Sequence, residues 1–262
     1  MDKSAINDAA RILWTTWTAN GRIDELPAAC RPSTRADGYL IQAEIARLSS
    51  QKTFGWKIAA TSKAGQKHIG VDGPLAGRLL EKRVAHSGAE VSLANNIMEV
   101  AEAEFAFRMA KDLPPRKSAY SIDEVKAAIA DLHPAIEIPD SRYRDFVTVG
   151  AAQLIADNAC ASYFVIGPVV VADWRQADLA RHPVTAHING KPAREGLGEN
   201  VLGGPLIALT WIANELSLAG DMLRAGDTIT TGTCIAPVPI AAGDHVIADF
   251  GAFGRVDARI RG

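Results

Sequence analysis

The stretch MEVAEAEFAFRM, residues 98–109, guides the interpretation of the rest of the chain. Its alternating pattern predicts a β-strand. Residues two apart on a strand point to the same face, so Glu102 and Glu104 project together. Alanine and phenylalanine fill the opposite face. Because a charged group on an apolar strand is unfavourable without a compensating partner, the pair indicates either an acidic strand edge in solvent or half of a cation site.

A third glutamate strengthens the interpretation as a cation site. Glu137 lies between Ile136 and Ile138 in a short apolar strand expected at 135–139. Neighbouring carboxylates repel one another, and a hard divalent ion such as Mg²⁺ or Mn²⁺ offsets this repulsion through oxygen ligands. A carboxylate-only set suits Mg²⁺, so we interpret the nearby His133 as the end of the preceding helix rather than as a ligand.

Lys57 is a second unusual charge. It lies between Trp56 and Ile58 in a strand expected over residues 52–61. The side chain either extends along apolar surface to reach solvent or lies in a pocket. In a pocket, desolvation would lower its pKa and make it usable for proton transfer. The residues alone leave both alternatives open.

Two loops carry further candidates. Asp157 and Asn158 follow an expected helix, where such residues commonly form a cap and a turn. A Gly- and Thr-rich segment, residues 225–244, lacks the spacing of a phosphate-binding loop. It indicates a strand and a tight loop whose Thr231, Thr233 and Cys234 side chains could line a cavity.

Composition excludes several classes of protein. The chain has 262 residues and a formal net charge of −2, without a polybasic run, so neither a nucleic acid nor an anionic membrane is expected as a partner. The three cysteines are far apart, which favours a reducing cytoplasm over a disulfide framework. No signal-peptide pattern is visible, and the longest apolar run, residues 163–172, is shorter than the about 20 residues that span a membrane. We expect a soluble cytoplasmic protein.

The chain divides into an expected helical N-terminal portion, residues 1–80, and a β-rich catalytic domain, residues 81–262, of the α+β class. A capping box at Ser121 and Glu124 predicts a helix over 122–132, and Asn189-Gly190 predicts a hairpin. The remaining expected helices are 4–19, 35–49, 62–71 and 203–220; the remaining expected strands are 90–93, 161–171, 183–188, 228–231, 244–250 and 255–260.

The motifs GWKIAATS, VAEAEFAF, AIEIPDSRY, ADNACAS and LGGPLIALTWIANEL follow one another in this order. From about residue 35 onward the chain resembles the 2-keto-4-pentenoate hydratase and 4-oxalocrotonate decarboxylase group of the fumarylacetoacetate hydrolase superfamily. The resemblance implies a mixed β-roll body with a helical N-terminal portion. It also implies Mg²⁺ or Mn²⁺ bound by Glu102, Glu104 and Glu137, with Lys57 as the active-site lysine.

The implied activity is that of a hydro-lyase in aromatic catabolism. The metal would chelate the 2-oxo or 2-hydroxy-enol group and the carboxylate of a small 2-hydroxy-2,4-dienoate or 2-oxo-enoate, and so stabilise an enolate. With 2-hydroxypenta-2,4-dienoate the product would be 4-hydroxy-2-oxopentanoate. The alternatives are a decarboxylase of a 4-oxalocrotonate-like diacid, a C–C hydrolase of the acylpyruvate type, and an inert paralogue or partner subunit. Related proteins form homo-oligomers, and we expect one here.

The resemblance suggests which residues touch the substrate, and two positions depart from the family pattern. Leu75 stands in VDGPLAG where many family hydratases have an acidic residue, and Cys160 stands where the family often has serine. A thiol is a weaker hydrogen-bond partner than a hydroxyl for a substrate carboxylate. The substrate-binding residues expected from the motifs are Arg78, Asp157, Cys160 and Thr233.

Overall fold

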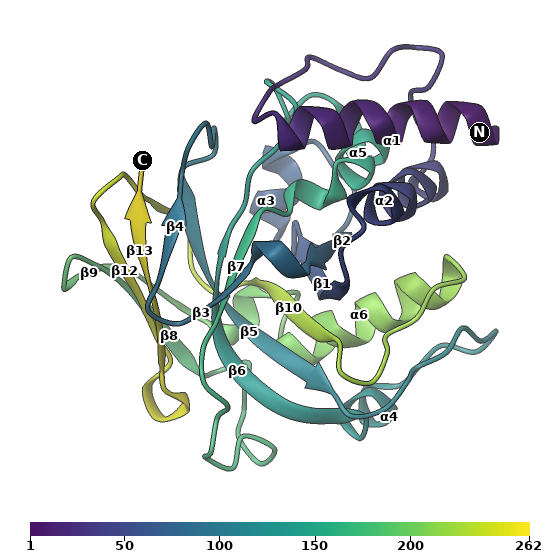
Figure 1. Ribbon diagram of the computed structural model, residues 1–262. Helices are drawn as coiled ribbons and strands as arrows, with labels where there is room; N and C mark the ends of the chain where they lie inside the picture. Colours follow the sequence, from purple (N-terminus) through teal and green to yellow (C-terminus); the bar gives the residue numbers. More distant parts are fainter.

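A computed structural model describes residues 1–262 of the protein and shows two curled β-sheets with a group of helices on one side (Figure 1). Helices α1 (Lys3–Thr18) and α2 (Arg35–Ser49) lie together there with α5 (Gly150–Ala156). Helix α2 begins with a capping box between Thr34 and Asp37. The apolar faces of these helices form a core of their own, which includes Leu13, Trp17 and Ile41.

The larger sheet contains eight strands in the order β2-β1-β10-β5-β6-β7-β3, with the short β11 beside β5. Strand β5 lies between β10 and β6, so it is not an edge strand. Its antiparallel ladder with β6 runs from Glu102 opposite Glu137 to Met109 opposite Ile129. The bounds are β1 Thr53–Ala59, β2 Leu75–Leu80, β3 Val84–His86, β5 Val100–Met109, β6 Ile129–Ile138, β7 Tyr163–Ile166, β10 Thr228–Thr233 and β11 Val238–Pro239.

The smaller sheet has the order β4-β13-β12-β8-β9 and shares the main core with the larger one. The ring of Phe105 from β5 packs edge-on against Phe250 beside β12, at 4.9 Å between centroids. The hairpin between β8 and β9 turns at Asn189 and Gly190, both with positive φ, which confirms the predicted turn. The bounds are β4 Ala89–Ser92, β8 Pro183–Ile188, β9 Lys191–Leu197, β12 His245–Asp249 and β13 Arg255–Arg261.

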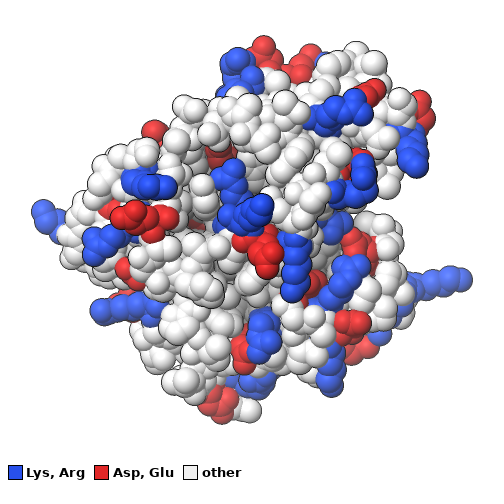
Figure 2. Space-filling view, viewed as in Figure 1, with Lys and Arg blue, Asp and Glu red and all other residues white.

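Three further helices complete the fold: α3 (Lys63–His68), α4 (Ile122–Lys126) and α6 (Pro205–Leu218). Residues Gly198–Leu218, which contain α6, are long and apolar enough to cross a membrane by length and composition alone. Helix α6, however, contributes Leu209, Ile212 and Leu216 to the main core, which accounts for its apolar character. Charges of both signs are interspersed over the face of the molecule seen in Figure 2.

The predicted fold class, a mixed β-roll with N-terminal helices, is confirmed, but several local predictions are wrong. The helix expected over 122–132 ends at Lys126, and β6 begins at Ile129, so His133 lies inside a strand. Pro134 suggested a helix end, yet the long ladder with β5 accommodates it. The strand expected over 161–171 ends at Ile166, before Gly167 and Pro168.

Strand β2 was not predicted, because the segment around Leu75 has few β-branched or aromatic residues. Strands β1 and β2 both lie before residue 81, yet they join the larger sheet through the parallel pairing of β1 with β10. The N-terminal segment therefore contributes helices to one core and two strands to the sheet that carries the predicted glutamates.

Candidate metal centre and active site

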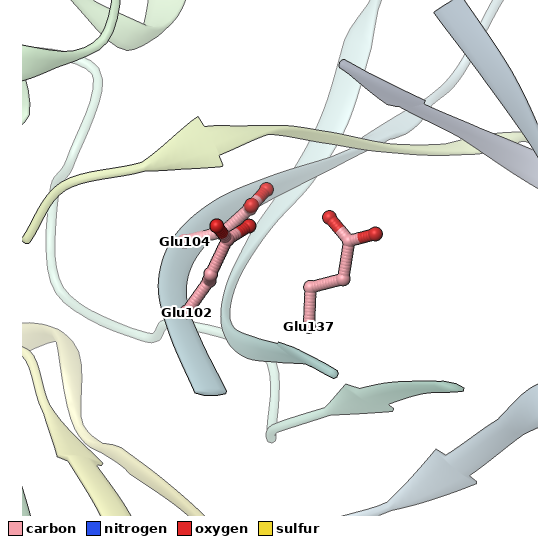
Figure 3. A group of neighbouring side chains, drawn as sticks. All are labelled: Glu102, Glu104 and Glu137. Carbon is pink, nitrogen blue, oxygen red and sulfur yellow. The ribbon is translucent and has the colours of Figure 1, made fainter. Parts of the chain in front are cut away.

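The three predicted glutamates converge. Glu102 and Glu104 project from β5, and Glu137 projects from β6 directly across the ladder from Glu102 (Figure 3). Carboxylate oxygens of all three lie within 4.8 Å of one another. Glu104 and Glu137 are fully buried, at 0% and 1% exposure. A solvated acidic strand edge is thereby excluded.

Strand β10 holds one oxygen of Glu104. The Thr230 hydroxyl and the Gly232 backbone N–H, at 2.7 Å, both donate to Oε2 of Glu104. Gly232 has a φ of 105°, and a Cβ there would lie 2.2 Å from the Thr61 hydroxyl oxygen, so only glycine fits this position. The strand end is therefore shaped to fix the orientation of the Glu104 carboxylate.

One carboxylate oxygen of Glu104 and one of Glu137 have no hydrogen-bond donor. Oε1 of Glu104 and Oε2 of Glu137 are buried and accept no hydrogen bond. Burial, with the nearby charge of Glu137 adding to it, raises the pKa of Glu102 to about 7. Burial likewise raises the pKa of Glu104 and Glu137. Buried polar atoms normally have partners, and hard divalent cations bind through such oxygens, so the donor set fits a Mg²⁺-like ion.

Lys57 lies against this cluster and does not reach solvent. Its side chain is 2% exposed, and Nζ lies 2.9 Å from Oε1 of Glu137. Burial acts to lower the pKa of Lys57, but the charges of Glu137, Glu102 and Glu104 outweigh it, so that pKa is raised. The pocket alternative is confirmed, whereas the lowered pKa expected from desolvation alone is wrong.

A left-handed turn fixes Lys57 from the other side. Asn158, Ala159 and Cys160 have consecutive positive φ angles of 56°, 50° and 60°, a strained conformation for residues with a side chain. The turn presents the Ala159 carbonyl oxygen, which accepts a hydrogen bond of 3.0 Å from Lys57 Nζ. The Asn158 side chain exchanges two hydrogen bonds of 2.7 Å with the backbone of Arg78, which anchors the turn to β2.

A cavity of about 660 Å³ opens beside Lys57 and Glu102. Thr233 and Cys160 line it, whereas Thr231 and Cys234, which the sequence also suggested for a cavity wall, are buried elsewhere. Burial raises the pKa of the Cys160 thiol to about 12. The Thr233 hydroxyl donates to the Ile235 carbonyl at 2.8 Å. Cys160 and Leu75 belong to one small apolar cluster, so both departures from the family pattern lie in the same place.

Two residues expected to bind substrate do not line this cavity. The Arg78 guanidinium bonds to Asp221 at 2.6 Å and stacks on the Trp56 ring. Asp157 accepts from the Ser141 hydroxyl and from the Arg142 backbone and side chain. The structure places both side chains in intramolecular ion pairs, which leaves neither directed at a ligand.

The sequence interpretation missed the residues that support the glutamates. Thr230 and Gly232 hold Glu104, and the Ala159 carbonyl holds Lys57 beside the cluster. Their one visible signal was the glycine inside the strand-like TITTGT, since such a glycine often marks a close backbone approach. A backbone carbonyl exposed by a turn leaves no such signal.

The chain is similar to a family model and to several named relatives. Residues 80–261 match the model of the fumarylacetoacetate (FAA) hydrolase C-terminal family. The chain is 38% identical over 217 residues to a 2-hydroxyhexa-2,4-dienoate hydratase of Comamonas testosteroni, covering 81% of each chain. It is 33% identical to a 2-keto-4-pentenoate hydratase of Burkholderia vietnamiensis, covering 98% of this chain and 97% of the relative.

A solved structure is similar over nearly the whole fold. The structure of 4-oxalocrotonate decarboxylase from Pseudomonas putida G7, complexed with magnesium and adipate, superposes with a TM-score of 0.89 and 29% identity. The alignment covers 99% of this chain and 98% of that one. With the family model matched over most of the chain, the protein belongs to the fumarylacetoacetate hydrolase family.

Proposed function

We propose that the protein is a metal-dependent hydratase that converts 2-hydroxypenta-2,4-dienoate or a close homologue into the 4-hydroxy-2-oxo acid. The observation that carries the proposal is the cluster of Glu102, Glu104 and Glu137, with unpartnered buried oxygens, beside Lys57 at a cavity. Two relatives that are named as dienoate or pentenoate hydratases support the same assignment.

We assign Mg²⁺ or Mn²⁺ to the three glutamates, because an all-carboxylate donor set suits these ions. When bound, the ion supplies a Lewis acid that polarises the oxygens of a 2-oxo acid. Thr230 and Gly232 hold the Glu104 carboxylate so that its free oxygen stays directed at the site. The protein therefore fixes the ligand geometry before substrate arrives.

The reaction requires a proton transfer and then an addition of water. In the first step the enol hydroxyl of the dienoate loses a proton and C5 gains one, which gives the 2-oxo-3-enoate. In the second step water adds its hydroxyl to C4 and its proton to C3. We assign the proton transfer to Lys57, which lines the cavity and is held by Glu137 and the Ala159 carbonyl. Its raised pKa keeps it as an ammonium group, which donates the proton to C5 and then regains the proton that the enol hydroxyl loses. Cys160 and Thr233 line the same cavity and are proposed to contact substrate.

The test is turnover of chemically prepared 2-hydroxypenta-2,4-dienoate, followed by the loss of its ultraviolet absorbance. We expect consumption with Mg²⁺ or Mn²⁺, formation of 4-hydroxy-2-oxopentanoate by mass spectrometry, and loss of activity after chelation. Release of carbon dioxide from a 2-oxo diacid without hydration would instead identify a decarboxylase. Consumption of neither substrate by the metal-loaded protein would favour an inert paralogue or a partner subunit.

Two further assignments belong to this proposal. A cytoplasmic location is supported by the three buried cysteines, which are free thiols. A homo-oligomer is expected from the resemblance to the family. Light scattering coupled to size-exclusion chromatography tests the oligomer, and a mass of about 28 kDa, that of one chain of 27.9 kDa, would contradict it.

A further inference from the structure

The residues that line the cavity beside the metal centre fall into two chemical groups, which we name its charged end and its apolar end. Glu102 and Lys57 form the charged end, next to the glutamate cluster. Twelve of the 22 residues that line the cavity are hydrophobic, among them Ile69, Ile97 and Phe146. A substrate whose 2-oxo and carboxylate groups occupy the charged end must place its tail among these apolar side chains.

Besides neutral hydroxyl and amide side chains such as Thr61, Ser62 and Asn200, the cavity offers few cationic partners to a second carboxylate. No arginine lines the cavity, and its lysine, Lys57, is already bound to Glu137 and the Ala159 carbonyl. The remaining side chain that can carry positive charge is His68, which is exposed and packs edge-on against Phe146. A carboxylate without a cationic partner loses hydration on entering such a place and gains little in return.

The cavity is also larger than a five-carbon acid requires. 2-Hydroxypenta-2,4-dienoate has eight non-hydrogen atoms, and even at about 30 Å³ for each, the share of a water molecule in the liquid, it fills roughly 240 Å³. The cavity measures about 660 Å³. More than half of the space therefore remains for a tail.

We propose that the cavity selects 2-oxo or 2-hydroxy-dienoic monocarboxylates with an uncharged apolar tail longer than that of the five-carbon acid, and discriminates against dicarboxylates. The inference rests on the proposed function for the position of the reacting end. Each tail methylene that becomes buried adds about a four-fold gain in affinity or kcat/KM until the space is filled. A terminal carboxylate on a tail of equal length lowers affinity roughly 100-fold.

Binding of unreactive 2-oxo acids tests the selection without requiring turnover. Isothermal titration calorimetry of the Mg²⁺-loaded protein compares 2-oxopentanoate, 2-oxooctanoate and the eight-carbon diacid 2-oxosuberate. We expect 2-oxooctanoate to bind more tightly than 2-oxopentanoate, and 2-oxosuberate to bind most weakly. Equal or tighter binding of the diacid would overturn the inference. This binding preference without hydration of any dienoate would instead overturn the proposed function and leave the selection intact.

A substitution that adds a cation to the apolar end sharpens the test. Ile97 lines the cavity and is 41% exposed, so Ile97→Arg is compatible with folding. The matched control is Ile122→Arg on α4, where the isoleucine is 40% exposed and lies away from the cavity. We expect Ile97→Arg to raise affinity for 2-oxosuberate at least 10-fold and to lower it for 2-oxooctanoate, with neither effect in the control. Unchanged affinity for both acids in Ile97→Arg would place the tail elsewhere and contradict the inference.

Discussion

The Arg142–Asp157 pair and Glu104 of the metal centre are buried to the same degree but differ in how their carboxylate oxygens are satisfied. Asp157 is 1% exposed, and both of its carboxylate oxygens accept hydrogen bonds from Ser141 or Arg142. Glu104 is 0% exposed and keeps one oxygen without any donor. A buried charge with every oxygen satisfied holds the fold together, whereas one with a free oxygen is available to bind a ligand.

Removing the charge of Asp157 should produce the largest change in stability. Asp157→Asn keeps the side-chain shape but leaves the Arg142 guanidinium buried without a counter-charge. We expect a loss of about 3 to 5 kcal/mol in the free energy of unfolding, measured by urea denaturation. The control is Asp131→Asn, because Asp131 pairs with the half-exposed Arg108 and should lose less than about 1 kcal/mol. Similar losses in both variants would mean that the buried pair contributes no more than a surface one.

Neutralising Glu104 in the metal centre should weaken metal binding and leave the stability of the metal-free protein unchanged. In Glu104→Gln the carbonyl oxygen can still accept from Thr230 and Gly232, but a ligand oxygen and a buried charge are lost. We expect affinity for Mg²⁺ to fall at least roughly 100-fold, with no loss of stability in the metal-free protein. Calorimetry and urea denaturation measure the two effects. The exposed Glu90 supplies the control Glu90→Gln, and Mg²⁺ affinity that is equal in both variants would remove Glu104 from the site.

Lys57 is partnered yet lies at the cavity, so its replacement separates chemistry from metal binding. Lys57→Met retains the apolar stem and removes the ammonium group. We expect Mg²⁺ to bind and kcat to fall about 100-fold, the usual scale for a lost acid–base group. The exposed Lys52, five residues earlier, provides the control Lys52→Met. Full activity of Lys57→Met would show that the lysine only neutralises Glu137.

Among the charge pairs compared here, the ion pair of Asp37 with the N-terminal amine should contribute little to stability. Hydrogen bonds from the amine, at 2.9 Å, and from Thr34 lower the pKa of Asp37 to about 2. Because the folded-state pKa lies below the unfolded value, the stabilisation is present above about pH 4 and is lost as the pH falls through 2. The unfolding free energy of the protein should exceed that of Asp37→Asn by about 1 kcal/mol near pH 5, and this difference should shrink toward pH 2. A difference that grows on acidification would contradict the assignment.

The sequence predicted those parts of the site that depend on local patterns. Alternation placed Glu102 and Glu104 on one face of a strand, and the apolar neighbours of Glu137 and Lys57 marked them as unusual. The structure brings all four together because β5 is paired with β6 and with β10, which is paired in turn with β1. The two-residue period of a strand can be recognised in the sequence, whereas the order of the strands in the sheet cannot.

The remaining features depend on contacts between distant residues. Asp221, which binds Arg78, lies 143 residues further along the chain, and no local sequence pattern predicts such a distant partner. The capping box at Ser121 and Glu124 suggested a helix up to residue 132, but pairing with β5 over most of β6 decided the outcome. The left-handed turn at 158–160 persists because Asn158 is bonded to β2, and that strand was itself not predicted.

The most direct test of the difference between the two charge clusters is an anomalous diffraction map of crystals grown with Mn²⁺. We predict one strong peak within about 2.5 Å of carboxylate oxygens from Glu102, Glu104 and Glu137, and none near Arg142 and Asp157. A cluster without a peak, at Mn²⁺ concentrations that support any measured turnover, would contradict the assignment of the three glutamates as a metal centre.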